Sequence, residues 1–226
     1  MTSGRPAWDE DKPGDLPAII ANIRSLWPTV EADARRRTLP SIDMVLYWHR
    51  RIYDGVQVPD RDYVGAFRDS DLTRPCLMDY EVAVGASRGT AARDVPVAVD
   101  SFIASLDQVV RALDAATTRG QVPVDPTTVR SIVRLCAYAH GEWIRIHPFA
   151  NGSGRTARLW ANWLAVRYAL PAFVRIKPRP ADTRFVGASA LSMGGDHRAT
   201  EILFVSMLND ALTQSPRRPH FATRRT

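Results

Sequence analysis

The stretch from Ile146 to Trp160, IHPFANGSGRTARLW, decides how the rest of this sequence is interpreted. It holds a histidine, a glycine-rich turn and two arginines three positions apart. Apolar residues at helical spacing precede and follow it, and Pro148 disfavours a helical conformation at His147. The pattern predicts a helix that stops near His147, a loop over HPFANGSG, and a second helix that begins by Thr156 and runs to Leu170.

This predicted loop has the composition of an anion-binding site. The first N–H groups of a helix have no partner within the helix, and the small residues Gly152, Ser153 and Gly154 let a ligand approach them closely. Arg155 and Arg158 share one face of the first turn, and each can add a fork of hydrogen-bond donors. Two arginines indicate a ligand with more than one phosphate.

Two further residues complete the chemistry of the loop. His147 carries an imidazole, which accepts a proton near neutral pH. Phe149 is predicted to turn inward and anchor the loop. A solvated connection would explain a Gly-Ser-Gly turn by itself, because such turns are common, but it does not explain the order of the whole stretch.

Composition limits the class of protein. The chain has 226 residues, of which 45% are hydrophobic and 24% charged, which is typical of one main globular domain. No apolar run is long enough to cross a bilayer and the N-terminus is polar and acidic, so we expect a cytoplasmic protein without a membrane partner. The net charge of +6 could suggest a nucleic-acid partner, but four of the arginines lie in the terminal stretch SPRRPHFATRRT, and none is expected.

The remaining periodicity is mostly helical. We predict one or two helices over 15–37, broken near Pro28, and a further helix capped by Ser41. An irregular region follows over 55–95, with a strand in YEVAV at 80–84. Two helices then begin at Pro96 and after the cap Asp125, and two more are predicted around 181–193 and 199–213. The resulting division is an N-terminal polar segment with helices over 1–40, a catalytic domain over 41–213, and a disordered basic tail over 214–226.

Some reactive residues fall on apolar faces, where packing explains them. His49 and His140 lie on predicted apolar stripes and are expected to be packed core histidines. The two cysteines, Cys76 and Cys136, have the spacing of neither a disulfide framework nor a metal site. We expect both thiols to be reduced.

The twelve residues HPFANGSGRTAR resemble the motif of the Fic family: His, any, Phe, any, Asp or Glu, Gly, Asn, Gly, Arg, two of any kind, Arg. Every defined position matches except Asn151 and Ser153. The resemblance extends over roughly residues 40–210 and includes the segment with Gly65, Phe67 and Arg68. It implies an all-α fold, a Fic-type helical core with a short β-hairpin flap.

The family's flap pairs with the backbone of a target protein. YEVAV stands at the flap's place in this sequence, so the resemblance assigns target binding to Glu81, Val82 and Ala83.

The resemblance also implies the reaction, the transfer of AMP from ATP to a Ser, Thr or Tyr hydroxyl of a target protein. His147 would be the general base and Phe149 the loop anchor. The anion hole would be formed by Gly152, Ser153 and Gly154, and the outer phosphates would be held by Arg155 and Arg158.

Asn151 stands where the family has an acidic residue that binds Mg²⁺. An amide oxygen can coordinate Mg²⁺ but brings no negative charge, so weak Mg²⁺ binding or a different donor is expected. A Fic-fold transferase using another phosphate-containing donor, and a catalytically weak nucleotide-binding module, therefore remain alternatives. A phosphotransferase of the Doc branch is disfavoured because this loop keeps Gly-x-Gly-Arg.

Many family members are inhibited by a glutamate that pairs with the second arginine of the motif. The motif that carries this glutamate is absent here, the nearest stretch being SMLND at 206–210. Arg158 is therefore expected to have no acidic partner in this chain, and inhibition is expected from a separate partner protein.

Overall fold

The computed structural model describes residues 6–8 and 11–213, so the predicted tail at 214–226 lies outside the described residues. The described part contains seven α-helices and one two-stranded sheet, which confirms a helical core with a short hairpin. In chain order the elements are α1 (Leu16–Arg36), α2 (Ile42–Ile52), β1 (Ala83–Val84), β2 (Ser87–Arg88), α3 (Val95–Ala116), α4 (Pro126–Ile146), α5 (Ser153–Arg167), α6 (Thr183–Met193) and α7 (Arg198–Thr213).

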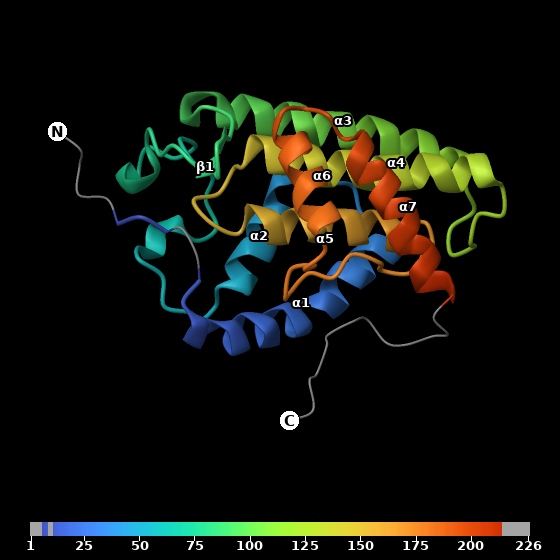
Figure 1. Cartoon of the computed structure of the whole chain (residues 1–226), viewed down its shortest axis with the longest axis horizontal. Coiled ribbons are helices and arrows are strands. Elements are labelled where there is room, and N and C mark those ends of the chain that lie inside the picture. The colour runs from blue at the N-terminus through green and yellow to red at the C-terminus, as the bar shows by residue number, and fades with distance from the viewer. Residues whose placement is uncertain (1–5, 9–10, 214–226) are drawn as a thin grey trace.

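Helix α5 is the centre of the core. Every residue of it except Gly154 is buried, as expected of a helix that is packed on all sides. Figure 1 shows α1 and α4 on either side of α5, with α6 and α7 packed over α4. The helix that carries the two motif arginines is thereby packed between α1 and α4, and α4 is covered in turn by α6 and α7.

The predicted break near Pro28 is wrong, because α1 runs unbroken from Leu16 to Arg36. Pro28 removes the hydrogen bond to the carbonyl of Arg24, but both residues lie on the exposed face, where water can reach that carbonyl. The buried stripe continues across Pro28 at helical spacing and packs against α5. Tertiary packing therefore outweighs the local cost of the proline.

The helix ends follow local signals in most cases. The Ser41 hydroxyl accepts a hydrogen bond from the Met44 N–H at 3.2 Å, and the Asp125 carboxylate accepts one from Thr128 N–H at 2.8 Å, which confirms both predicted N-caps. Helix α5 ends at Arg167, three residues before the predicted end at Leu170, because Ala169 adopts a left-handed conformation with φ of 59°.

The strand predicted over 80–84 is shorter than expected. Only Ala83–Val84 form β1, which pairs antiparallel with Ser87–Arg88 of β2. Below the two strands the Gly89 N–H donates to the Val82 carbonyl at 3.0 Å. The irregular region thus contains a small exposed hairpin.

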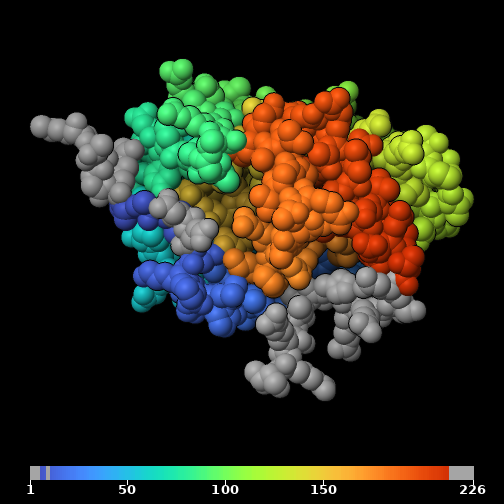
Figure 2. Space-filling model, viewed as in Figure 1, coloured from blue at the N-terminus to red at the C-terminus, as the bar shows by residue number. Residues whose placement is uncertain are grey.

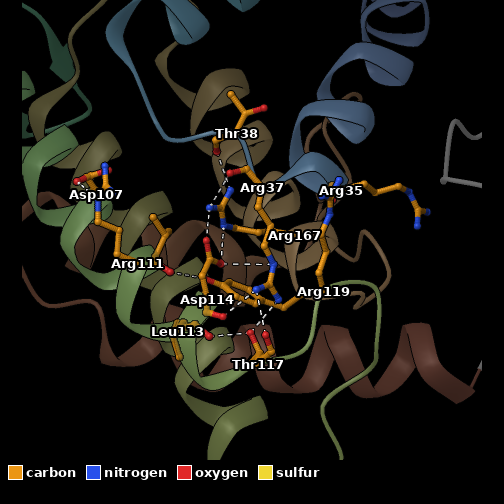
Figure 3. Close-up of polar contacts among 12 residues, drawn as sticks. Arg35, Arg37, Thr38, Asp107, Arg111, Leu113, Asp114, Thr117, Arg119 and Arg167 are labelled. Atoms are coloured by element: carbon orange, nitrogen blue, oxygen red, sulfur yellow. Dashed lines mark hydrogen bonds and ion pairs between the residues drawn. The ribbon is translucent and has the colours of Figure 1, made fainter.

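A polar network joins the C-terminal ends of three helices (Figure 3). The buried Arg167 of α5 pairs with Asp114 of α3 at 2.5 Å and donates to the Thr38 carbonyl beyond α1 at 2.6 Å. Arg37, at the end of α1, donates to the Asp114 and Thr117 carbonyls at 2.9 and 3.0 Å. Cations beside helix C-termini are favourable, so the network fixes how α1, α3 and α5 meet.

His140 has the packed environment that the sequence predicts. His140 is buried against Phe185 and Phe204, and burial lowers its pKa to about 3, which leaves the imidazole neutral. Cys76 and Cys136 are free thiols. Among the described helices, none combines the length and apolarity needed to span a bilayer.

Candidate functional site

His147 is the last residue of the turn that closes α4, in a left-handed conformation with φ of 50°. Its Nδ1 lies 3.2 Å from the Ile144 carbonyl oxygen. A carbonyl only accepts hydrogen bonds, so Nδ1 carries the proton and Nε2 keeps a lone pair in the neutral ring. Burial, opposed by the Ile144 bond and assisted by the charge of Arg68, lowers the pKa of His147 to about 4. The imidazole is therefore neutral near pH 7 and able to accept a proton.

His49, on α2, supports the motif loop between α4 and α5. Its Nδ1 accepts from the Gly65 N–H at 2.9 Å, so its Nε2 is protonated and donates to the Asn151 carbonyl at 2.9 Å. The ring stacks on Phe149 with centroids 3.8 Å apart. Burial lowers the pKa of His49 to about 4, which keeps this tautomer neutral. The prediction of a packed histidine is confirmed, but its support of the loop carried no sequence signal.

The small residues of the loop are required by its close packing. Gly152 has φ of +89°, and a Cβ there would lie 3.0 Å from His49 Nε2 and Tyr53 Oη, so any other residue would be strained and tightly packed. Ser153 turns its hydroxyl inward, where it accepts from the Phe149 N–H at 3.2 Å. Phe149 is fully buried. The loop is thus closed by contacts on its inner side.

The start of α5 offers the anion-binding groups that the sequence predicts. The N–H groups of Ser153 and Gly154 have no hydrogen-bond partner within the described chain. The Gly152 N–H instead donates to the Asn151 Oδ1 at 2.6 Å. Two of the three predicted N–H donors are therefore open to a ligand.

These groups line one pocket of about 330 Å³. The lining residues are His147, Asn151, Gly152, Ser153, Gly154, Arg155 and Arg158, with Asp11, Lys177 and Arg179 from outside the motif. In Figure 2 the chain near residue 150, in gold, floors a recess between the green hairpin region and the orange segment after α5. Four cationic side chains and one carboxylate share this pocket, so its charge favours an anion.

The two motif arginines have different partners. Arg155 donates to the Tyr53 hydroxyl and pairs with the Asp11 carboxylate, a contact that sequence reasoning missed. Arg158 Nε donates to the Ile176 carbonyl at 2.9 Å, and no carboxylate of the described residues pairs with it. Burial lowers the pKa of Arg155 to about 10; burial and nearby arginines lower that of Arg158 to about 9, so both remain charged at neutral pH.

Asn151 is not arranged as a magnesium ligand. Its Oδ1 accepts from the Gly152 N–H at 2.6 Å and lies 3.5 Å from Arg155 Nη1, so donors already surround the oxygen. The only carboxylate in the described lining, on Asp11, is paired with Arg155 and Lys177. This donor set does not fit Mg²⁺, which prefers charged, accessible oxygens. The magnesium site stays a prediction.

Arg68 connects the hairpin to the motif loop. Its buried guanidinium donates to the Tyr80 and Thr90 carbonyls, each at 2.8 Å, and to the Ile146 and His147 carbonyls at 3.1 and 2.9 Å. The last two carbonyls belong to the end of α4, where a helix leaves acceptors unpaired. One side chain thus fixes the hairpin beside the residue with the candidate catalytic imidazole.

The predicted flap residues lie on or beside this hairpin. The Glu81 carboxylate accepts from the Ala92 N–H at 3.0 Å, and the Val82 carbonyl accepts from Gly89. Ala83 is exposed in β1, which within the described chain pairs with β2 alone. The other edge of β1 is available for a further strand.

A family model described as the Fic/DOC family matches residues 39–165. This chain belongs to the Fic/DOC family. The match covers the buried His49, the hairpin, and the whole loop from His147 to Arg158. The pocket residues from His147 to Arg158 are therefore those of a Fic domain.

Curated relatives of this Fic protein are named as protein adenylyltransferases. The chain is 29% identical over 144 residues to protein adenylyltransferase fic-1 of Caenorhabditis elegans, which covers 64% of this chain and 22% of the relative. It is 38% identical over 66 residues to protein adenylyltransferase Fic of Drosophila persimilis, covering 29% and 13%. The chain thus spans less than a quarter of the length of these relatives.

Solved Fic structures share the fold. A Fic domain-containing signaling protein from Bacteroides thetaiotaomicron aligns with a TM-score of 0.60 at 19% identity, covering 89% of this chain and 70% of that one. BepC from Bartonella tribocorum, solved with bound AMPPNP, aligns with a TM-score of 0.56 at 13% identity, covering 92% and 94%. The helical core with one hairpin is therefore a Fic fold.

Proposed function

We propose that this Fic protein transfers AMP from ATP to a Ser, Thr or Tyr hydroxyl of a target protein. One observation carries the proposal: the His147 imidazole shares a pocket with two arginines and the open N–H groups of α5. A proton acceptor beside a polyphosphate-binding site is what attack on a nucleotide phosphate requires. The adenylyltransferase relatives and the AMPPNP-bound BepC support the choice of ATP.

The reaction would begin at His147. Nε2 takes the proton of the target hydroxyl, whose oxygen bonds to the α-phosphorus, while the bond from that phosphorus to the β-phosphate oxygen breaks and pyrophosphate leaves. The Ile144 carbonyl holds Nδ1–H, which keeps Nε2 in the acceptor state. The Ser153 and Gly154 N–H groups and the two arginines stabilise the charge that accumulates on the phosphates. No step depends on a bound metal.

The hairpin would bind the target. An extended target segment adds to the open edge of β1 at Ala83, and Glu81 and Val82 support the hairpin from below. Arg68 fixes the hairpin relative to the end of α4, so a bound segment is presented to His147.

Asn151 favours a second candidate, transfer from another phosphate-containing donor. The family position that carries a charged metal ligand carries here an amide whose oxygen is already hydrogen bonded. A donor that binds through cationic side chains alone would suit that arrangement.

Intact-mass analysis after incubation with ATP and with each other nucleotide tests the proposal. A mass increase of one AMP unit on the protein or on an added target, with release of pyrophosphate, is the expected result. His147→Ala should abolish transfer and retain nucleotide binding, and His197→Ala, outside the pocket, is the matched control. Equal transfer by the His147 variant would contradict the base assignment, and a different mass increase would favour the second candidate.

A further inference from the structure

Two cations of the pocket, Lys177 and Arg179, come from outside the motif, and Lys177 is the one that pairs with an acid. Lys177 lies on the segment between α5 and α6 and lines the pocket together with Arg155. Its Nζ is 3.4 Å from Asp11 Oδ2, the carboxylate oxygen that also pairs with Arg155. Two cations from different elements thus hold one anion.

The backbone before Lys177 is fixed to α5. Arg158 donates to the Ile176 carbonyl at 2.9 Å. Asn162 donates to the Val174 carbonyl at 2.6 Å and accepts from the Val174 N–H at 3.0 Å. The helix of the motif therefore holds the backbone that leads directly into Lys177.

Asp11 is an incompletely satisfied anion. Its side chain is 7% exposed, yet its Oδ1 is buried without a hydrogen-bond partner. The chain shortly before it is anchored: Trp8 is buried against Tyr53, with centroids 4.6 Å apart, and its N–H donates to the Tyr80 hydroxyl at 3.1 Å. The Asp11 carboxylate therefore lies beside Arg155 and Lys177, in a position that a free anion of greater charge can take over.

We propose that Lys177 binds a phosphate of the donor, and that Asp11 holds the position between Lys177 and Arg155 until that phosphate replaces it. The inference rests on the proposed function, because it concerns the same donor. A phosphate brings more charge and more acceptor oxygens than a carboxylate, so it satisfies both cations more completely. The donor class is a nucleoside polyphosphate, because Arg155, Arg158 and Lys177 line one pocket and together offer charge for more than one phosphate.

Calorimetric titration of ATP and of AMP in a metal-free buffer tests this. The proteins are the wild type, Lys177→Met, Asp11→Asn and the double variant. Lys12→Met is the matched control for Lys177, because Lys12 is the other lysine of the chain, is exposed and does not line the pocket. Circular dichroism checks that each variant is folded.

Removing Lys177 should weaken ATP binding roughly ten-fold, and removing the Asp11 charge should strengthen it roughly ten-fold, the scale of one partly shielded charge pair. Both effects should be smaller for AMP, which lacks the outer phosphates. The loss of ATP affinity caused by Lys177→Met should be larger in the Asp11→Asn background than in the wild type. In the wild type the same change also weakens the binding of the competing Asp11 carboxylate, which offsets part of the loss.

Two results would overturn the inference and leave the proposed function standing: ATP affinity unchanged by Lys177→Met, or ATP affinity lowered by Asp11→Asn. Failure of every folded variant to bind ATP would instead overturn the proposed function itself, and this inference with it.

Discussion

Replacing Arg68 by methionine should destabilise the protein by about 4 kcal/mol. The guanidinium is fully buried and donates four hydrogen bonds, to the carbonyls of Tyr80, Thr90, Ile146 and His147. At a net value of about 1 kcal/mol each, these bonds give the figure of about 4 kcal/mol, against a typical domain stability of roughly 5 to 15 kcal/mol. Methionine fills much of the space but leaves four carbonyl oxygens without a donor.

The cost of burying the Arg68 cation makes about 4 kcal/mol an upper limit for this loss of stability. Burial lowers the pKa of Arg68 to about 10, with the charge of Glu81 opposing that shift, so the folded state bears a cost for holding the cation. Methionine removes that cost. Arg68→Lys keeps the charge, but its single ammonium cannot reach four carbonyls in different directions, so an intermediate loss of about 2 kcal/mol is expected.

Urea denaturation followed by circular dichroism measures both variants. Arg119→Met is the matched control, because Arg119 is exposed and makes one bond, to the Arg35 carbonyl at 2.8 Å; its change should be below about 0.5 kcal/mol. An Arg68→Met protein within about 1 kcal/mol of the wild type would refute the reasoning, because the desolvation of the cation would then cancel its hydrogen bonds.

Three further predictions concern ionisation and charge. Because the pKa of His147 is lowered to about 4, the transfer rate should stay level from about pH 8 to about pH 5.5 and fall only near pH 4; an acid limb near pH 6.5 in the pH–rate profile would contradict this. Below about pH 6.5 His140 becomes protonated in the unfolded state but stays neutral in the folded state, where its pKa is about 3, so acid lowers the stability of the wild type. His140→Leu lacks this loss, and its free energy of unfolding relative to the wild type should therefore be about 2 kcal/mol higher at about pH 5 than at about pH 8. Calorimetric melting that shows the same difference at both pH values would contradict the prediction. Asn151→Asp should raise Mg²⁺ affinity roughly ten-fold by calorimetry, and weaker nucleotide binding at saturating Mg²⁺ would oppose a metal at that position.

Features set by neighbouring residues could be predicted from the sequence. Ser41 and Asp125 cap their helices through bonds two to three residues away, and Pro148 ends α4 at the residue before His147. The order of residues in the motif likewise placed its histidine and arginines around one pocket, because a helix end, a tight turn and a helix start leave the chain few alternatives.

Features set by distant residues could not be predicted. Pro28 carries a helix-breaking signal, but the packing of α1 against α5 decides the outcome. Asp11 lies in a polar N-terminal segment that has no periodicity, and only the fold brings its carboxylate to Arg155. Nor does anything local distinguish His49 from other histidines on an apolar stripe, since its two partners come from different parts of the chain.

The lack of periodicity over 55–95 has a physical cause in the needs of the motif loop between α4 and α5. A loop that turns its N–H groups toward a ligand leaves backbone acceptors on its inner side, and these need donors from elsewhere. Arg68 supplies donors to the carbonyls of Ile146, His147 and Pro148, the last through its backbone N–H at 2.9 Å, while Gly65 fixes the ring of His49. A regular helix would use these backbone groups internally and could not supply them. The irregular segment is therefore the element that allows the loop to present its polar groups outward.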